Sequence, residues 1–248
     1  MVYGPVDALP RPTRTMPRTF PLLTVFAALL LSGGCIPYAT GTTAATVAPG
    51  EVEPGTAVYF VPGGIETLTA DSSGGSLIGF DVEARMGLDE RSDLGIRLPG
   101  AVGAVLDYKR RVTGLEDPDG PGLALLVGGG VVNGGEHAIA MGGFVASGRR
   151  TDRATPYGGF KAMQVFPLTE EAVEDDPTIG FFAGLRIGTQ GLGVSPEIAV
   201  FYDRSALGLR DNDVILVPSL TVHGDQLLDA LLGRRPPTYP RPPRGPWR

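Results

Sequence analysis

The sequence predicts an all-β protein in which one antiparallel meander closes into a small β-barrel of about eight to ten strands. Three observations support this class. Apolar and polar residues alternate with a period of two through most of residues 56–223, as they do in strands. Turn residues separate these segments, and glycine is abundant, with 37 among 248 residues. Nowhere in this region do apolar residues convincingly repeat at helical spacing.

The expected strands follow one another along the chain. The clearest is 80–86, where Asp81, Glu83 and Arg85 share one face and apolar residues share the other. Further strands are expected at 94–98, 102–109, 123–132, 138–147, 157–166, 179–188, 197–203 and 214–222, with 56–61 as an additional candidate. Asn133-Gly134-Gly135 predicts a hairpin turn, and Pro99-Gly100 either turns or kinks the chain. The longer of these strands suit tilted membrane-crossing strands of roughly 9–11 residues.

The face that combines glycine with charge is expected to line the barrel interior. Glycine weakens a strand unless something approaches closely, and a narrow barrel needs small residues beside large ones. Gly180, Gly184 and Gly188 share a face with Arg186 in this way. The predicted luminal charge network comprises Asp81, Glu83, Arg85, Arg97, Asp107, Lys109, Arg186, Glu197 and Asp203. The alternation is also compatible with a soluble β-sandwich whose charged face lies in water.

The amino-terminal residues have the order of an export signal. Arg18 precedes the apolar run 20–31, and Ser32, Gly33 and Gly34 follow it. The run is too short for the roughly 20 residues of a membrane-spanning helix. We therefore expect a signal peptide over residues 1–34, with Met16 as the true start.

Residues 31–35, Leu-Ser-Gly-Gly-Cys, resemble the lipobox of bacterial lipoproteins, with Ser32 where leucine is usual. The resemblance implies cleavage before Cys35 and attachment of fatty acyl chains such as palmitate to this residue. Residues 35–54, rich in Thr, Ala, Gly and Pro, are then expected to be a flexible lipidated tether. The barrel domain is expected over 55–225, and an Arg/Pro-rich disordered tail over 226–248.

Residues 85–98, Arg-Met-Gly-Leu-Asp-Glu-Arg-Ser-Asp-Leu-Gly-Ile-Arg-Leu, resemble a hairpin common in small, mostly uncharacterised outer-membrane β-barrel proteins of bacteria. The resemblance implies a barrel whose apolar face meets lipid and whose polar face fills the lumen. It implies a location in the bacterial outer membrane, but it indicates no particular activity.

Composition excludes several kinds of partner and cofactor. The net charge of −6 becomes −8 when residues 1–34 are removed, because they hold three arginines and one aspartate. An acidic chain disfavours nucleic acid as a partner. The lone cysteine supports neither an internal disulfide nor a Cys-based zinc site. His137 and His223 are near different strand ends, so neither a metal site nor a catalytic set is expected, and no cofactor motif is present.

We therefore expect a non-catalytic, lipid-anchored barrel protein of the bacterial envelope, in contact with membrane lipid. Its narrow lumen is expected to be filled by side chains, so a general pore is not predicted. One alternative is a soluble, periplasm-facing β-sandwich lipoprotein that binds a ligand or partner. A second is a lipid-modifying barrel enzyme, which would need Ser, His and an acid to converge in space.

Overall fold

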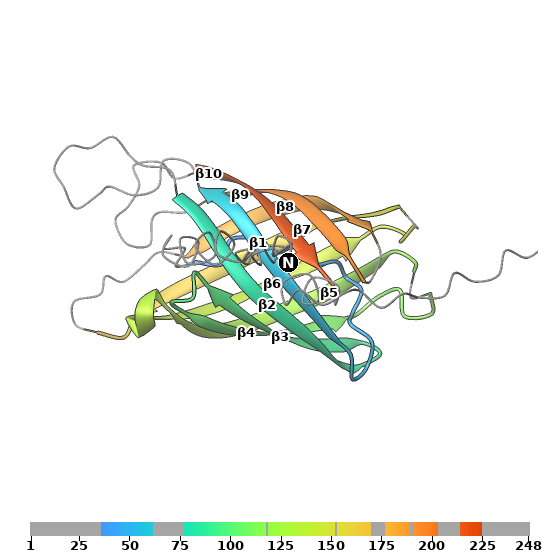
Figure 1. Ribbon diagram of the computed structural model, residues 1–248, viewed down its shortest axis with the longest axis horizontal. Coiled ribbons are helices and arrows are strands. Elements are labelled where there is room, and N and C mark those ends of the chain that lie inside the picture. The colour runs from blue at the N-terminus through green and yellow to red at the C-terminus, as the bar shows by residue number, and fades with distance from the viewer. Residues whose placement is uncertain are drawn as a thin grey trace, which may run out of the picture.

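The computed structural model describes residues 36–61, 77–117, 119–151, 153–169, 177–188, 191–202 and 214–224. Within these residues ten antiparallel strands and one 3-10 turn form a closed barrel (Figure 1). The elements are β1 (Val52–Val61), β2 (Leu77–Asp89), β3 (Ser92–Pro99), β4 (Ala104–Arg111), β5 (Gly122–Val132), η1 (Asn133–Gly135), β6 (His137–Ser147), β7 (Ala154–Pro167), β8 (Thr178–Gly188), β9 (Gly193–Tyr202) and β10 (Val214–His223).

The predicted barrel is confirmed, and the sandwich alternative is wrong. β1 pairs with β2 on one side and with β10 on the other, where Gly55 faces His223 and Tyr59 faces Ser219. This pairing closes the sheet and removes its edges, so every strand has two hydrogen-bonded neighbours. The candidate strand at 56–61 is therefore part of the barrel, and it begins earlier, at Val52.

The barrel has two distinct ends. We call the end where β1 begins and β10 finishes the near end, and the opposite end the far end. β10 runs toward the near end in Figure 1, whereas η1 lies at the far end. In η1, Asn133, Gly134 and Gly135 all have positive φ, as the hairpin prediction requires. Pro99-Gly100 forms a turn rather than a kink, because Gly100 and Ala101 have positive φ there.

Residues 85–98 form the β2–β3 hairpin. The turn is stabilised by Asp89, whose carboxylate accepts a hydrogen bond of 2.7 Å from the Arg91 amide. Leu94, Ile96 and Leu98 point outward, whereas the alternate residues of β3 face the lumen. The motif thus places apolar side chains outside the wall and charged ones inside it.

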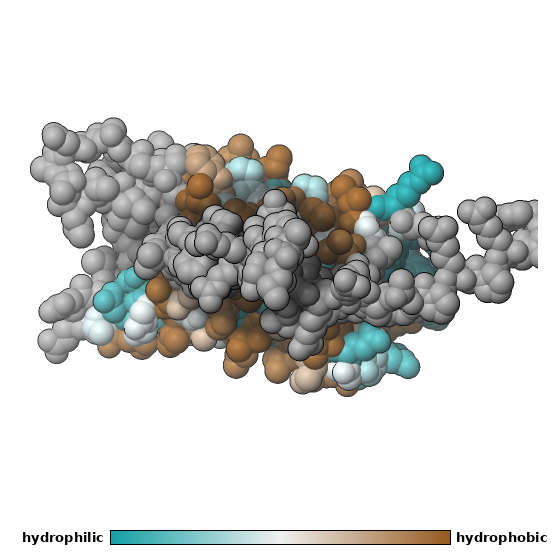
Figure 2. Space-filling model, in the orientation of Figure 1, coloured by the Kyte–Doolittle hydropathy of each residue, from teal (hydrophilic) through white to brown (hydrophobic). Residues whose placement is uncertain are grey.

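The outer surface of the barrel is apolar on all ten strands. Some of its large side chains are more exposed than buried, with Phe181 at 67%, Ile198 at 57% and Val127 at 56% of full exposure. Figure 2 shows hydrophobic residues along the middle of the barrel and hydrophilic residues toward its ends. Away from the two residues at either end of each strand, no charged side chain faces outward in the described strands.

The expected flexible tether is wrong for the residues that the structure describes. Residues 36–48, which we call the luminal segment, lie inside the barrel, and residues 36–44 are buried. Tyr38 packs edge-on against Tyr59 of β1 and Phe201 of β9, with ring centroids 6.1 Å and 5.2 Å apart. The segment is ordered because the barrel wall encloses it, although its own composition is that of a linker.

The described residues contain no helix that is both long enough and apolar enough to span a membrane.

Candidate functional site

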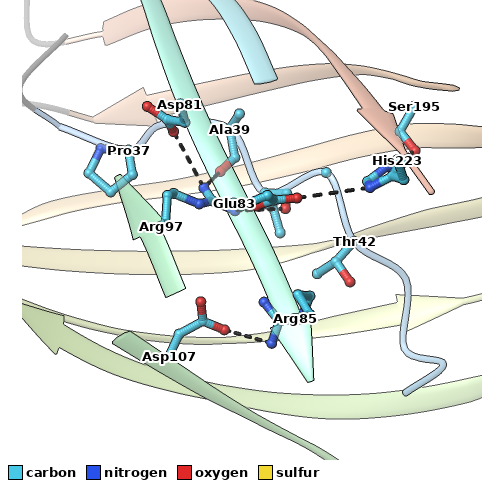
Figure 3. A network of polar contacts seen from close by, with 12 residues as sticks. Pro37, Ala39, Thr42, Asp81, Glu83, Arg85, Arg97, Asp107, Ser195 and His223 are labelled. Carbon is cyan, nitrogen blue, oxygen red and sulfur yellow. Dashed lines mark hydrogen bonds and ion pairs between the residues drawn. The ribbon is translucent and has the colours of Figure 1, made fainter. Parts of the chain in front are cut away.

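The most unusual feature of the molecule is the filled lumen, where charged side chains hold the luminal segment by its main chain. At the far end, the Tyr59 hydroxyl donates to the Ile36 carbonyl at 2.8 Å, and Lys161 donates to the Pro37 carbonyl. Arg97 donates to the Ala39 carbonyl (Figure 3). These contacts satisfy carbonyl groups that have no strand partner, which is the condition for burying them.

The middle of the luminal segment is bound by a carboxylate. Both oxygens of Glu197 on β9 accept main-chain hydrogen bonds, from the Thr40 amide at 2.9 Å and the Gly41 amide at 3.0 Å. Gly41 has a φ of 61°, and a Cβ there would lie 2.4 Å from the Thr221 hydroxyl oxygen. The backbone angle favours glycine at this position, and the close approach of Thr221 leaves no room for a side chain.

Toward the near end, Lys109 of β4 is the main contact of the luminal segment. Its ammonium donates to the Thr42 hydroxyl at 2.9 Å and to the Thr43 and Ala45 carbonyls at 3.2 Å and 2.7 Å. The Val47 amide then donates to Asp93 of β3 at 3.1 Å. Lysine suits this position because one ammonium group directs three donors at different acceptors.

Two sets of ion pairs form the lumen wall around the segment. In the first, the Arg85 guanidinium contacts Asp93 at 2.6 Å and Asp107 at 2.7 Å, and Lys109 contacts Asp93 at 3.2 Å. In the second, Arg97 contacts Glu83 at 2.6 Å and Asp81 at 3.7 Å. All of these side chains are buried, so each charge depends on its partners for the solvation it has lost.

A glycine makes room for the first set. A Cβ on Gly95 would lie 2.6 Å from an Asp107 oxygen and 2.7 Å from an Arg85 nitrogen. The absence of a side chain at Gly95 therefore allows the Arg85–Asp107 ion pair to cross β3.

The structure brings most of the predicted luminal residues together. Asp81, Glu83, Arg85, Arg97, Asp107, Lys109 and Glu197 are all buried in the lumen. Arg186 lies at the near end, where it forms a two-pronged ion pair with Glu53 at 2.7 Å and 3.2 Å. Asp203 and Cys35 lie outside the described residues.

Several luminal residues escaped the sequence analysis. They are Glu53, Asp93, Arg111, Lys161, Ser195 and His223. Asp93 shares a strand face with Gly95 and Arg97, and Arg111 continues the face of Asp107 and Lys109, so extending the alternation by one step would have found both. Glu53 lies within the expected tether, whose composition predicts a linker rather than a strand.

One group of luminal residues has the composition of a catalytic triad. The Ser195 hydroxyl lies 2.8 Å from Nε2 of His223, and the other ring nitrogen faces Glu53 at 3.8 Å and Glu83 at 3.9 Å. These last two distances exceed a hydrogen bond, so neither acid orients the ring as a triad requires. Ser195 is also completely buried, so a substrate has no access to its hydroxyl in this structure.

A cavity of about 590 Å³ opens at the near end, beside the luminal segment. Its charged lining includes Glu51, Glu53, Arg85, Lys109, Arg111, Arg150 and Arg186. The buried cations of this lining already contact carboxylates or main-chain carbonyls. The Arg111 guanidinium, for example, donates hydrogen bonds to the carbonyls of Thr113, Asp117 and Gly120. No cluster of three His, Cys, Asp or Glu residues positioned for a metal occurs among the described residues.

Solved structures similar to this chain include three proteins of bacteria. Neisserial surface protein A has 12% identity and a TM-score of 0.33, with 70% of this chain and 95% of that chain covered. The attachment invasion locus protein Ail of Yersinia pestis, in complex with sucrose octasulfate, has 12% identity and a TM-score of 0.28, with 70% and 94% covered. The N-terminal β-barrel domain of Pseudomonas aeruginosa OprF has 11% identity and a TM-score of 0.27, with 70% and 98% covered.

No protein-family model matches the sequence, and a search of curated proteins finds none that is similar.

Proposed function

We propose that the chain is a non-catalytic β-barrel protein of the bacterial outer membrane, anchored by a lipid on Cys35 and closed by its own luminal segment. The observation that supports this proposal most strongly is the distribution of side chains on the barrel wall, which is apolar on the outside and charged on the inside. Exposed apolar side chains occur on every strand, from Val58 on β1 to Leu216 on β10, and Phe181 of β8 is the most exposed among them at 67%. Soluble monomers seldom expose apolar patches larger than a few hundred Å².

The inside of the wall supports the same proposal. A barrel in water gains nothing from burying ion pairs, because charges are solvated more cheaply at the surface. In a lipid bilayer a charged side chain on the outer face destabilises the barrel, so polar side chains are favoured in the lumen. The strands of 8–14 residues also match the roughly 9–11 residues that a tilted strand needs to cross the bilayer.

A closed lumen favours a structural or interaction role over transport. The luminal segment and the side chains around Tyr38, Tyr59 and Phe201 occupy the interior that a pore would need. Among the described residues, the enzyme alternative is supported by the Ser195–His223 pair, which is buried, and neither of its residues lines the cavity at the near end. The proposed partners are therefore membrane lipids and proteins that meet the ends of the barrel.

The proposal is tested by producing the full chain in a Gram-negative host supplied with an alkyne fatty acid. We expect the protein in the outer-membrane fraction, with a gel mobility that changes on boiling and with incorporated fatty acid. The matched variant Cys35→Ser should lose the fatty acid. A folded product in the soluble fraction without detergent would contradict the membrane barrel. Fatty acid that persists in Cys35→Ser would contradict the proposed anchor.

A further inference from the structure

The luminal segment runs antiparallel to β1, so its two ends lie at opposite ends of the barrel. Its carboxyl end is at the near end, where Pro49 forms a parallel bridge with Gly87 and the Gly50 amide donates to the Gly87 carbonyl. Its amino end points to the far end, because the Ile36 carbonyl accepts from Tyr59, two residues before β1 finishes.

Contacts between these two points keep the same order. Proceeding from the far end, Arg97 contacts the Ala39 carbonyl, Glu197 contacts the Gly41 amide and Lys109 contacts the Ala45 carbonyl. In Figure 3, Pro37, Ala39 and Thr42 follow one another along the lumen beside β2. The direction of the segment is therefore determined by hydrogen bonds to its main chain between Ile36 and Val47, most of which are buried.

The level of Ile36 is close to the edge of the apolar outer surface. Tyr59, which contacts Ile36, lies two residues before the end of β1 at Val61, and two residues of an extended strand span about 7 Å. Phe60 and Ile78, which pair across β1 and β2, present exposed apolar side chains at this same level. Cys35 is joined to Ile36 by one peptide unit of about 3.8 Å. If Cys35 carries a lipid, the position of Ile36 would bring that lipid to the far-end rim of the apolar outer surface.

A second pass of chain through the lumen, from Ile36 back to the near end, is excluded by the packing there. Tyr38, Tyr59 and Phe201 fill the lumen with close ring contacts. Interiors packed at this density have no room for a second strand of chain.

We infer that the chain threads its own barrel, so that Cys35 leaves the lumen by the far end and its lipid enters the leaflet there. This inference rests on the proposed function. Membrane barrels have short periplasmic turns and longer extracellular loops. The strands that meet at the far end are separated by long intervals of sequence, 62–76, 168–177 and 203–213, whereas 112–121 is the long interval between strands that meet at the near end. The partner of the anchor is therefore lipid of the outer leaflet, at the cell surface.

The test compares one epitope at three positions in the full-length chain. The first is directly after Cys35, between the anchor and the luminal segment. Gly134 marks the far end and Gly50 the near end, and nothing lies within 4 Å of the Cβ position of either glycine. Antibody binding to intact cells is compared with binding after the outer membrane is permeabilised.

We expect the epitopes after Cys35 and at Gly134 to bind antibody on intact cells, and the epitope at Gly50 to bind only after permeabilisation. If the epitope after Cys35 behaves like the one at Gly50, threading is overturned. Labelling of the Gly50 epitope alone on intact cells would overturn the outer-leaflet placement. Failure of the proposed function gives a different result from failure of threading. If the protein is not a membrane barrel, the epitopes at Gly134 and Gly50 would label alike, or the protein would be absent from the membrane fraction.

Discussion

Substitution of Val127 by arginine separates a lipid-facing barrel wall from a water-facing one. Val127 is the middle residue of β5 and is 56% exposed, and its strand neighbours are Tyr108 and Gly142. Arginine facing lipid at the bilayer midplane costs about 2–4 kcal/mol. This corresponds to a loss of roughly 30- to 700-fold in the folding equilibrium constant. In water, the same exposed position would accept arginine with a change of about 0.5 kcal/mol or less.

The assay is urea unfolding of the full chain in lipid vesicles, followed by the gel mobility that distinguishes folded from unfolded protein. The matched control is Leu115→Arg, which adds the same charge in the 112–121 connection, at a side chain that is 39% exposed. We expect Val127→Arg to lower the free energy of unfolding and Leu115→Arg to leave it nearly unchanged. Equal effects of the two substitutions would refute a lipid-facing β5.

Three further predictions concern the lumen. Arg97→Gln leaves two buried carboxylates without their cation, so it should lower the free energy of unfolding in detergent by about 3–5 kcal/mol. Arg110→Gln, on the outer face, should change it by about 0.5 kcal/mol or less, and similar losses would contradict the ion-pair network. Gly95→Ala should lower the free energy of unfolding by about 1–3 kcal/mol through overpacking. Gly142→Ala should be tolerated, because a Cβ there would meet nothing closer than 3.8 Å. A Gly95→Ala protein as stable as Gly142→Ala would show that the Arg85–Asp107 ion pair does not cross β3 at Gly95. Glu197→Ala removes the acceptor of the Thr40 and Gly41 amides, so hydrogen exchange at these two amides should become faster. Hydrogen exchange of the strand amides should stay the same. Unchanged exchange at Thr40 and Gly41 would mean that the Glu197 carboxylate does not hold the luminal segment.

The residue pattern alone determined the strands and the direction that most side chains face. Alternation is a local property, because successive side chains of an extended chain point to opposite sides whatever lies beyond them. Asp81, Glu83 and Arg85 could therefore be assigned to one face before any partner was known, and all three are luminal. The hairpin at 85–98 was equally local, since its turn and its two strands are contiguous.

The tertiary structure decided which charges meet and where the amino-terminal segment lies. Arg85 finds Asp93 and Asp107 only because β2, β3 and β4 are neighbours in a sheet that closes on itself. The luminal segment shows no period, because its main chain bonds to side chains rather than to a strand. Its acceptor Glu197 is 157 residues away from Thr40 along the chain. A segment with the composition of a linker is ordered here by the wall that surrounds it, and only closure of the barrel provides that wall.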